Sequence, residues 1–178
     1  MPIRRVHIMG ASGAGVTTLG RALADALGLP HHDTDDYYWQ PTDPPYREKR
    51  DIPDRLRLMH ELFLPRPSWV LSGSLDSWGD PIRGLLDLVV FLRTPTEIRL
   101  ARLRDREQRR GWDDETQNFL EWASHYDDGT REGRSLLRHE TWLKALRSRV
   151  LRLDGTLPVA DLVDRIVTAT TMQGRAKS

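Results

Sequence analysis

A glycine-rich segment between a predicted strand and a predicted helix constrains the fold of this chain more than any other feature. Residues 3–9 predict a short strand, and Leu19, Leu23 and Leu27 recur at helical spacing until Gly28. The segment between them, residues 10–18, reads GASGAGVTT. Backbone N–H groups at the start of such a helix favour anionic oxygens. The segment therefore predicts a phosphate-binding loop; the alternative is a strand-to-helix turn whose glycines serve only close packing.

The glycine spacing is that of a P-loop, with one departure. Valine stands at position 16, where a P-loop normally carries lysine. That lysine stabilises charge that develops between the β- and γ-phosphates during phosphoryl transfer, whereas a hydroxyl, here Thr17, holds Mg²⁺. The predicted nucleotide-binding residues are Gly10, Ala11, Ser12, Gly13, Ala14, Gly15, Val16, Thr17 and Thr18.

Composition limits the classes of function. The chain has 178 residues, which suits one α/β domain over residues 1–178, and its 27 basic and 26 acidic residues give a net charge of +1. Without a global basic field, nucleic acid is not an expected partner. The absence of cysteine excludes thiol catalysis and thiolate metal sites. The apolar runs are strand-sized, so we expect a cytoplasmic protein with no membrane association. Whether it is a monomer or a homodimer stays open.

Predicted strands alternate with predicted helices along the chain. Further strands are expected at residues 29–33, 69–72, 88–92 and 150–153, and helices at residues 54–64, 114–125 and 132–147. This alternation is typical of a parallel sheet covered on both faces, which gathers ligands at the carboxyl ends of its strands.

Two carboxylates and a short polar turn follow predicted strands at that edge. Asp33 and Asp35 are two positions apart in a segment expected to be extended, so both side chains should point the same way. One could act on Mg²⁺ and the other on an acceptor hydroxyl; alternatively one or both cap a helix that begins near Tyr37. Gly73 and Ser74 lie where a substrate would sit, although a plain turn explains them as well.

Arginines are abundant, whereas only three lysines occur, so an arginine is the best candidate to replace the missing lysine. Two rows have helical spacing: Arg99, Arg102 and Arg106 in one, and Arg131, Arg134 and Arg138 in the other. A guanidinium can grip phosphate or stack on a base. The alternative is that these are solvated helix faces, and we prefer it for Arg99 and Arg131.

The chain resembles the adenylate kinase and shikimate kinase group of P-loop small-molecule kinases. His32-Asp33-Thr34-Asp35 looks like the Asp-x-Asp element of shikimate kinases. Residues 88–92 with Arg102 and Arg106 are similar to the strand and lid-entering helix of nucleoside monophosphate kinases, and residues 153–159 to their adenine-binding loop. Residues 71–76, however, match neither family's corresponding element.

The resemblance implies a three-layer P-loop NTPase fold with strand order 2-3-1-4-5. It also implies an acceptor-binding region at residues 41–67 and a helical lid at residues 107–138. By this resemblance, Asp33 and Thr17 would bind Mg²⁺, and Asp35 would contact the acceptor. Arg106 would contact the nucleotide. Gly155 and Leu157 would contact adenine. Arg102 and Arg138 are further catalytic candidates, Arg138 by position only.

These expectations predict an ATP- and Mg²⁺-dependent kinase that acts on a small-molecule acceptor, with Asp35, Gly73 and Ser74 at the acceptor. Two alternatives are a nucleotide-binding regulatory protein that has lost catalysis and a partner-dependent NTP hydrolase. Retention of Thr17 and the Asp33/Asp35 pair favours catalysis, because a protein that only binds nucleotide needs neither a metal ligand nor an acceptor acid.

Overall fold

The computed structural model describes residues 4–112 and 114–175, and its centre is one five-stranded parallel sheet. The strands are β1 (Arg5–Gly10), β2 (His31–Asp33), β3 (Trp69–Ser72), β4 (Leu88–Arg93) and β5 (Arg149–Asp154). They lie in the order β2-β3-β1-β4-β5, and each adjacent pair is parallel. The expected strand order and the α/β fold class are confirmed.

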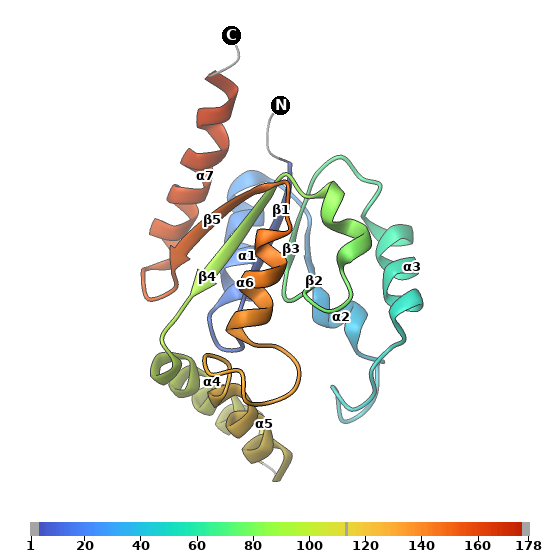
Figure 1. Cartoon of the computed structure of the whole chain (residues 1–178), viewed down its shortest axis with the longest axis vertical. Coiled ribbons are helices and arrows are strands. Elements are labelled where there is room, and N and C mark those ends of the chain that lie inside the picture. Colours follow the sequence, from blue (N-terminus) through green and yellow to red (C-terminus); the bar gives the residue numbers. More distant parts are fainter. Residues whose placement is uncertain (1–3, 113, 176–178) are drawn as a thin grey trace.

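Helices cover both faces of the sheet (Figure 1). Those helices are α1 (Val16–Leu27), α2 (Thr34–Tyr38), α3 (Ile52–Leu62), α4 (Thr96–Arg110), α5 (Asp114–Ser124), α6 (Leu136–Lys144) and α7 (Val159–Arg175), with a 3₁₀ helix at Asp80–Leu85. Apolar residues of α1 and α7 pack with Val6, Ile8 and Val90 on one face. Side chains of α3 and α6 pack with Leu71 and Phe91 on the other. None of the described helices combines the length and apolar character needed to cross a membrane.

The carboxyl ends of the strands meet at one edge, and α4 and α5 lie beyond it (Figure 1). These two helices pack together through Leu103, Leu120 and Ala123. The loop from residue 10 to residue 15 is at the same edge, because β1 leads directly into it and α1 follows. The fold therefore brings the glycine loop and the expected lid together.

The expected helix at residues 132–147 is shorter in the structure. Gly133 has a positive φ of 100°, and Ser135 caps α6 by accepting a hydrogen bond from the Arg138 backbone N–H. The helix therefore begins only at Leu136, and Arg131 and Arg134 precede it. The prediction that Arg131, Arg134 and Arg138 share one helical face is wrong.

Candidate active site

The glycine loop has the backbone conformation that an anion-binding loop requires. Gly13 and Gly15 have positive φ angles of 79° and 95°, and Gly15 is the N-cap of α1. A Cβ atom on Gly13 would lie 2.6 Å from the Arg99 carbonyl oxygen, so only glycine fits there. The N–H of Ala14 donates to Ala11 O at 3.0 Å. The N–H groups of Gly13 and Gly15 have no backbone acceptor among the described residues. These N–H groups can therefore bind an anion.

Val16 contributes an apolar side chain beneath this loop. It is buried and belongs to the apolar cluster that contains Leu19 and Leu23. Its Cγ2 atom would lie 3.1 Å from a Cβ atom on Gly10, which shows how closely it packs against the end of β1. Val16 therefore supplies no positive charge to the glycine loop.

Thr17 and Asp33 meet beside the loop. The Thr17 hydroxyl donates a hydrogen bond to Asp33 Oδ2 at 2.7 Å, and Asp33 Oδ1 accepts one from the Asp35 backbone N–H at 3.1 Å. Asp33 is thus the N-cap of α2, which begins at Thr34. The alternative that one of the acids caps a helix is confirmed, although the helix starts earlier than Tyr37. The expectation of an extended segment with both carboxylates pointing the same way is wrong, because Asp35 lies in the first turn of α2.

The donor set at Thr17 and Asp33 fits Mg²⁺. A hydroxyl and a carboxylate are the hard oxygen ligands that this ion prefers, and it commonly takes only one or two protein ligands together with phosphates and water. Across the described part of the chain, no group of three or more His, Cys, Asp or Glu side chains could form a closed metal cage. A cation held here would therefore depend on phosphate oxygens for the rest of its shell.

Asp35 is placed among opposing charges. Removal of water by the surrounding protein raises its pKa, and the neighbouring carboxylates of Asp33 and Asp36 raise it further. Arg134 and Arg106 partly offset these effects, so both guanidinium groups lie near enough to act on Asp35. A carboxylate with a raised pKa is a better proton acceptor than an ordinary one.

Arg102 borders a cavity of about 190 Å³ next to the glycine loop. Its Nη1 donates to Ala14 O at 3.3 Å and its Nη2 to Gly155 O at 3.1 Å. A Cβ atom on Gly155 would lie 2.1 Å from Thr94 Oγ1, so this turn also requires glycine. The cavity is lined by Ala14, Gly15, Thr18, Leu19, Leu92, Arg102, Gly155, Leu157, Val159 and Leu162. Apolar walls with one guanidinium suit a flat heteroaromatic ring. Gly155 and Leu157 lie together at this cavity, but the arginine beside them is Arg102, whereas the resemblance assigned Arg106 to the nucleotide.

Arg106 and Arg138, the other two predicted arginines, each have an acidic partner. Arg106 Nε donates to Glu107 Oε1 at 2.6 Å, and its guanidinium lies 5.7 Å from the Phe119 ring centre. Arg138 Nε lies 3.3 Å from Asp76 Oδ2. The structure therefore places Arg106 near Asp35 but pairs it with Glu107, and it places Arg138 on Asp76 instead of on the glycine loop.

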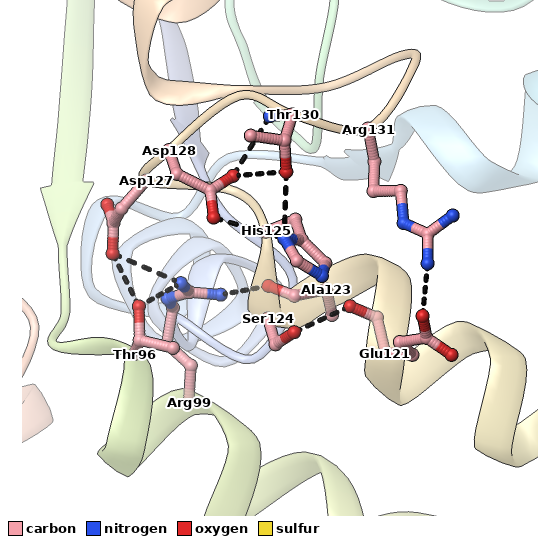
Figure 2. A network of polar contacts seen from close by, with 10 residues as sticks. All are labelled: Thr96, Arg99, Glu121, Ala123, Ser124, His125, Asp127, Asp128, Thr130 and Arg131. Carbon is pink, nitrogen blue, oxygen red and sulfur yellow. Dashed lines mark hydrogen bonds and ion pairs between the residues drawn. The ribbon is translucent and has the colours of Figure 1, made fainter.

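Arg99 is a buried structural residue, and the expectation of a solvated position for it is wrong. Its side chain is 1% exposed and donates to Thr94 O and Ala123 O, each at 3.2 Å. It also donates to Thr96 Oγ1 at 2.7 Å and lies 3.5 Å from Asp127 (Figure 2). Arg99 therefore joins the start of α4 to the end of α5. Arg131, in contrast, is exposed and ion-paired with Glu121, as expected for a solvated position.

Arg134 belongs to the second arginine row named from the sequence, but it was not among the catalytic candidates chosen from that row. It is half-buried in the loop before α6, and its Nη1 donates to Ser12 Oγ in the glycine loop at 3.3 Å. No carboxylate of the described residues lies within 4.0 Å of it. The sequence signal that could have found it is Ser135, whose capping of α6 leaves Arg134 in a loop and not on a helix face.

A buried polar network lies behind the predicted acceptor residues. Gly73 has a φ of 118°, and a Cβ atom there would lie 1.7 Å from Thr34 Oγ1, so the turn requires glycine. Ser74 Oγ donates to Asp76 Oδ1 at 2.6 Å and lies 2.9 Å from His139 Nε2. Ser74 is therefore held by protein groups, and no sequence pattern pointed to His139 as its partner.

Asp76 and His139 have opposite charge tendencies within this network. Burial alone would raise the pKa of Asp76, but the His139 ring (3.7 Å) and the Ser74 hydroxyl hold it well below its usual range. Burial lowers the pKa of His139, which agrees with a neutral ring that accepts from Tyr126 at Nδ1 (2.8 Å) and donates to Ser74 at Nε2. An ionised carboxylate and a neutral imidazole therefore flank Ser74.

The predicted acceptor region and the predicted lid touch each other. Arg47 forms an ion pair with Glu115 of α5, and the Arg110 guanidinium lies 5.9 Å from the Tyr46 ring centre. Both contacts join residues 41–67 to residues 107–138. The structure therefore shows these two regions in contact at the carboxyl edge of the sheet.

Comparison with known sequences assigns the family. No protein-family model matches the chain. The chain is 42% identical over 173 residues to the uncharacterized protein YqaC of Bacillus subtilis (strain 168), and the match covers 92% of this chain and 96% of YqaC. The chain belongs to the YqaC family. Membership in the YqaC family does not identify an activity, so the reaction has to be inferred from the residues of the site.

Solved structures similar to this YqaC-family chain share its fold. A shikimate kinase from Acinetobacter baumannii in complex with shikimate is 21% identical with a TM-score of 0.59, covering 98% of this chain and 96% of the kinase. A gluconokinase from Sinorhizobium meliloti 1021 is 18% identical with a TM-score of 0.58, covering 98% of each chain. A sugar kinase from Janibacter sp. HTCC2649 is 22% identical with a TM-score of 0.53, covering 94% of each. At these identities the similarity establishes the P-loop NTPase fold of the YqaC-family chain.

Proposed function

We propose that this protein transfers the terminal phosphoryl group of ATP to a hydroxyl group of a small molecule. The observation that carries the proposal is the arrangement at the carboxyl edge: the glycine loop, the Thr17–Asp33 contact of 2.7 Å and the Asp35 carboxylate lie together. A protein that only bound nucleotide would need no acceptor acid. The folds of the shikimate kinase, the gluconokinase and the sugar kinase support the same class of reaction.

Each part of the proposed site has a role set by its position. The cavity beside Arg102 takes the base, and the N–H groups of Gly13 and Gly15 take the phosphates. Thr17 and Asp33 hold Mg²⁺, which neutralises charge on the phosphate oxygens when bound. Asp35 accepts the proton of the acceptor hydroxyl while that oxygen forms its bond to phosphorus. The contacts of Arg47 and Arg110 hold the lid region against the acceptor region, and a closed lid would limit transfer to water instead of to the acceptor.

The test is a screen for phosphorylated products with Mg·ATP and a panel of sugars, hydroxy acids, nucleosides and nucleotides. The matched variants are Asp35→Asn and Asp36→Asn, which change neighbouring carboxylates of the same helix. We expect Asp35→Asn to lower kcat about 10²–10⁴-fold and Asp36→Asn to leave it within about threefold. Equal losses would contradict the role of Asp35. Calorimetric ATP binding with no product from any acceptor would identify a nucleotide-binding protein, and ADP release without an acceptor would identify a hydrolase.

A further inference from the structure

We propose that Arg134 supplies the positive charge that Val16 does not, by contacting the transferred phosphoryl group from the lid. This inference rests on the proposed function, and it names the residue that completes the site. A valine at position 16 leaves a P-loop without its cation. The candidates to supply this cation are the guanidinium groups of the arginines near the glycine loop.

The other arginines near the loop are already engaged. Arg99 is buried and bonded to backbone carbonyls, and Arg102 bridges two further carbonyls at the edge of the base cavity. Arg106 pairs with Glu107, and Arg138 pairs with Asp76. Each would have to give up a protein partner before it could bind a phosphate.

Arg134 is the guanidinium whose donors remain available. The single hydrogen bond that it makes in the described structure joins Nη1 to Ser12 Oγ at 3.3 Å, so the group lies directly at the glycine loop. The positive charge of Arg134 lowers the pKa of both Asp35 and Asp76, although neither carboxylate lies within 4.0 Å of the guanidinium. A half-buried guanidinium with free N–H groups, between a phosphate-binding loop and an acceptor acid, matches the position of the transferred group.

The backbone near Arg134 is fixed by local structure. Ser135, the next residue, is buried and caps α6, and Gly133 before it has a positive φ of 100°. The side chain therefore reaches the loop from an ordered segment and not from a free end.

In the transfer step, the bond from phosphorus to the oxygen that bridges the β- and γ-phosphates breaks, and a bond from phosphorus to the acceptor oxygen forms. The acceptor proton goes to Asp35, and the bridging oxygen leaves with ADP. Arg134 donates N–H groups to the phosphoryl oxygens and transfers no proton. Its contribution is electrostatic, as that of the P-loop lysine would be.

Binding is the first arm of the test and does not depend on turnover. Calorimetry compares Mg·ATP with Mg·ADP for the wild type, Arg134→Gln, Arg134→Lys and the matched control Arg131→Gln, an exposed arginine paired with Glu121. We expect Arg134→Gln to weaken ATP binding about tenfold more than ADP binding. Arg134→Lys should recover part of the loss, and Arg131→Gln should change neither affinity. Equal weakening of ATP and ADP would overturn the inference, and thermal unfolding of each variant checks that the fold is intact.

Turnover is the second arm. We expect Arg134→Gln to lower kcat about 10²–10³-fold with little change in the KM of the acceptor. Val16→Lys added to Arg134→Gln should restore at least tenfold of the lost activity, because it returns a cation to the ordinary P-loop position. An Arg134→Gln enzyme with wild-type kcat would refute the assignment while leaving the kinase proposal intact. A wild type that phosphorylates nothing would remove the kinase proposal, and the binding arm would still report on Arg134.

Discussion

Replacement of Arg99 by methionine tests how strongly the lid is joined to the rest of the fold. Methionine is shorter than arginine but keeps most of the apolar contact of its aliphatic part, and it removes every donor. The variant loses the hydrogen bonds to Thr94 O and Ala123 O, two acceptors in residues that are themselves buried. It also loses the bond to Thr96 Oγ1 and the ion pair with Asp127.

The magnitude follows from which of these groups water can reach. Each buried carbonyl left without a donor costs about 1–3 kcal/mol. Asp127 is 41% exposed, so water replaces most of what the carboxylate loses. The guanidinium itself no longer has to be buried, which offsets part of the cost. We therefore expect Arg99→Met to lower the free energy of unfolding by about 3–4 kcal/mol.

Urea unfolding at pH 7, followed by circular dichroism, measures this change. The matched control is Arg131→Met, which removes an exposed ion pair with Glu121 from the same part of the molecule (Figure 2) and should cost no more than about 1 kcal/mol. If the two variants lose the same stability, the buried contacts of Arg99 do not hold the lid. Loss of more than 3 kcal/mol with an unchanged m-value would support the reasoning.

Two further predictions concern single side chains at the site. Asp76→Asn should cost about 1–3 kcal/mol at pH 7, because it removes a buried carboxylate that accepts from Ser74 and pairs with the partly exposed Arg138. Since the pKa of Asp76 is lowered in the folded state, the carboxylate stabilises the fold above its ordinary pKa of 3.8, and this stabilisation is lost as the pH falls below that value. Urea titrations at several pH values should therefore show the stability difference between the variant and the wild type shrinking below pH 3.8. A stability difference independent of pH would contradict the ion pair. Arg102→Leu should weaken ATP and ADP binding equally, by about tenfold in calorimetry, because Arg102 borders the base cavity; a larger loss for ATP than for ADP would place it at the γ-phosphate instead.

The sheet and the glycine loop could be predicted because local pattern determines them. The three central strands, β1, β3 and β4, are short and almost entirely buried apolar runs, whereas β2 and β5 at the edges are only partly buried. The positive φ angles of Gly13 and Gly15 follow from glycine spacing. Gly155 and Leu157, which the resemblance placed beside the nucleotide, both line the cavity next to the glycine loop; their contact with a base stays a prediction. These features need only neighbours in sequence or a matching motif.

The positions of charged side chains could not be predicted in the same way, because their partners are distant in sequence. Spacing alone treats Arg99 as a surface residue, whereas its burial depends on Ala123, 24 positions away. Asp35 lies in α2 next to Thr34, which is buried and accepts a hydrogen bond from the Ser74 backbone N–H, 40 positions away. Arg134 reaches Ser12 across 122 positions. Tertiary contacts decide each of these cases.

The exchange of a P-loop lysine for a lid arginine has a consequence for unwanted hydrolysis. A lysine on α1 would stay beside the phosphates whether or not the lid is closed, because it would belong to the same element as the loop. Arg134 belongs to a segment that follows α5, and α5 touches the acceptor region through Glu115 and Arg47. On this proposal, the positive charge is complete only while the lid and the acceptor region are together. Water would then meet an incomplete site when the lid is open, and the acceptor would meet a complete one when it is closed.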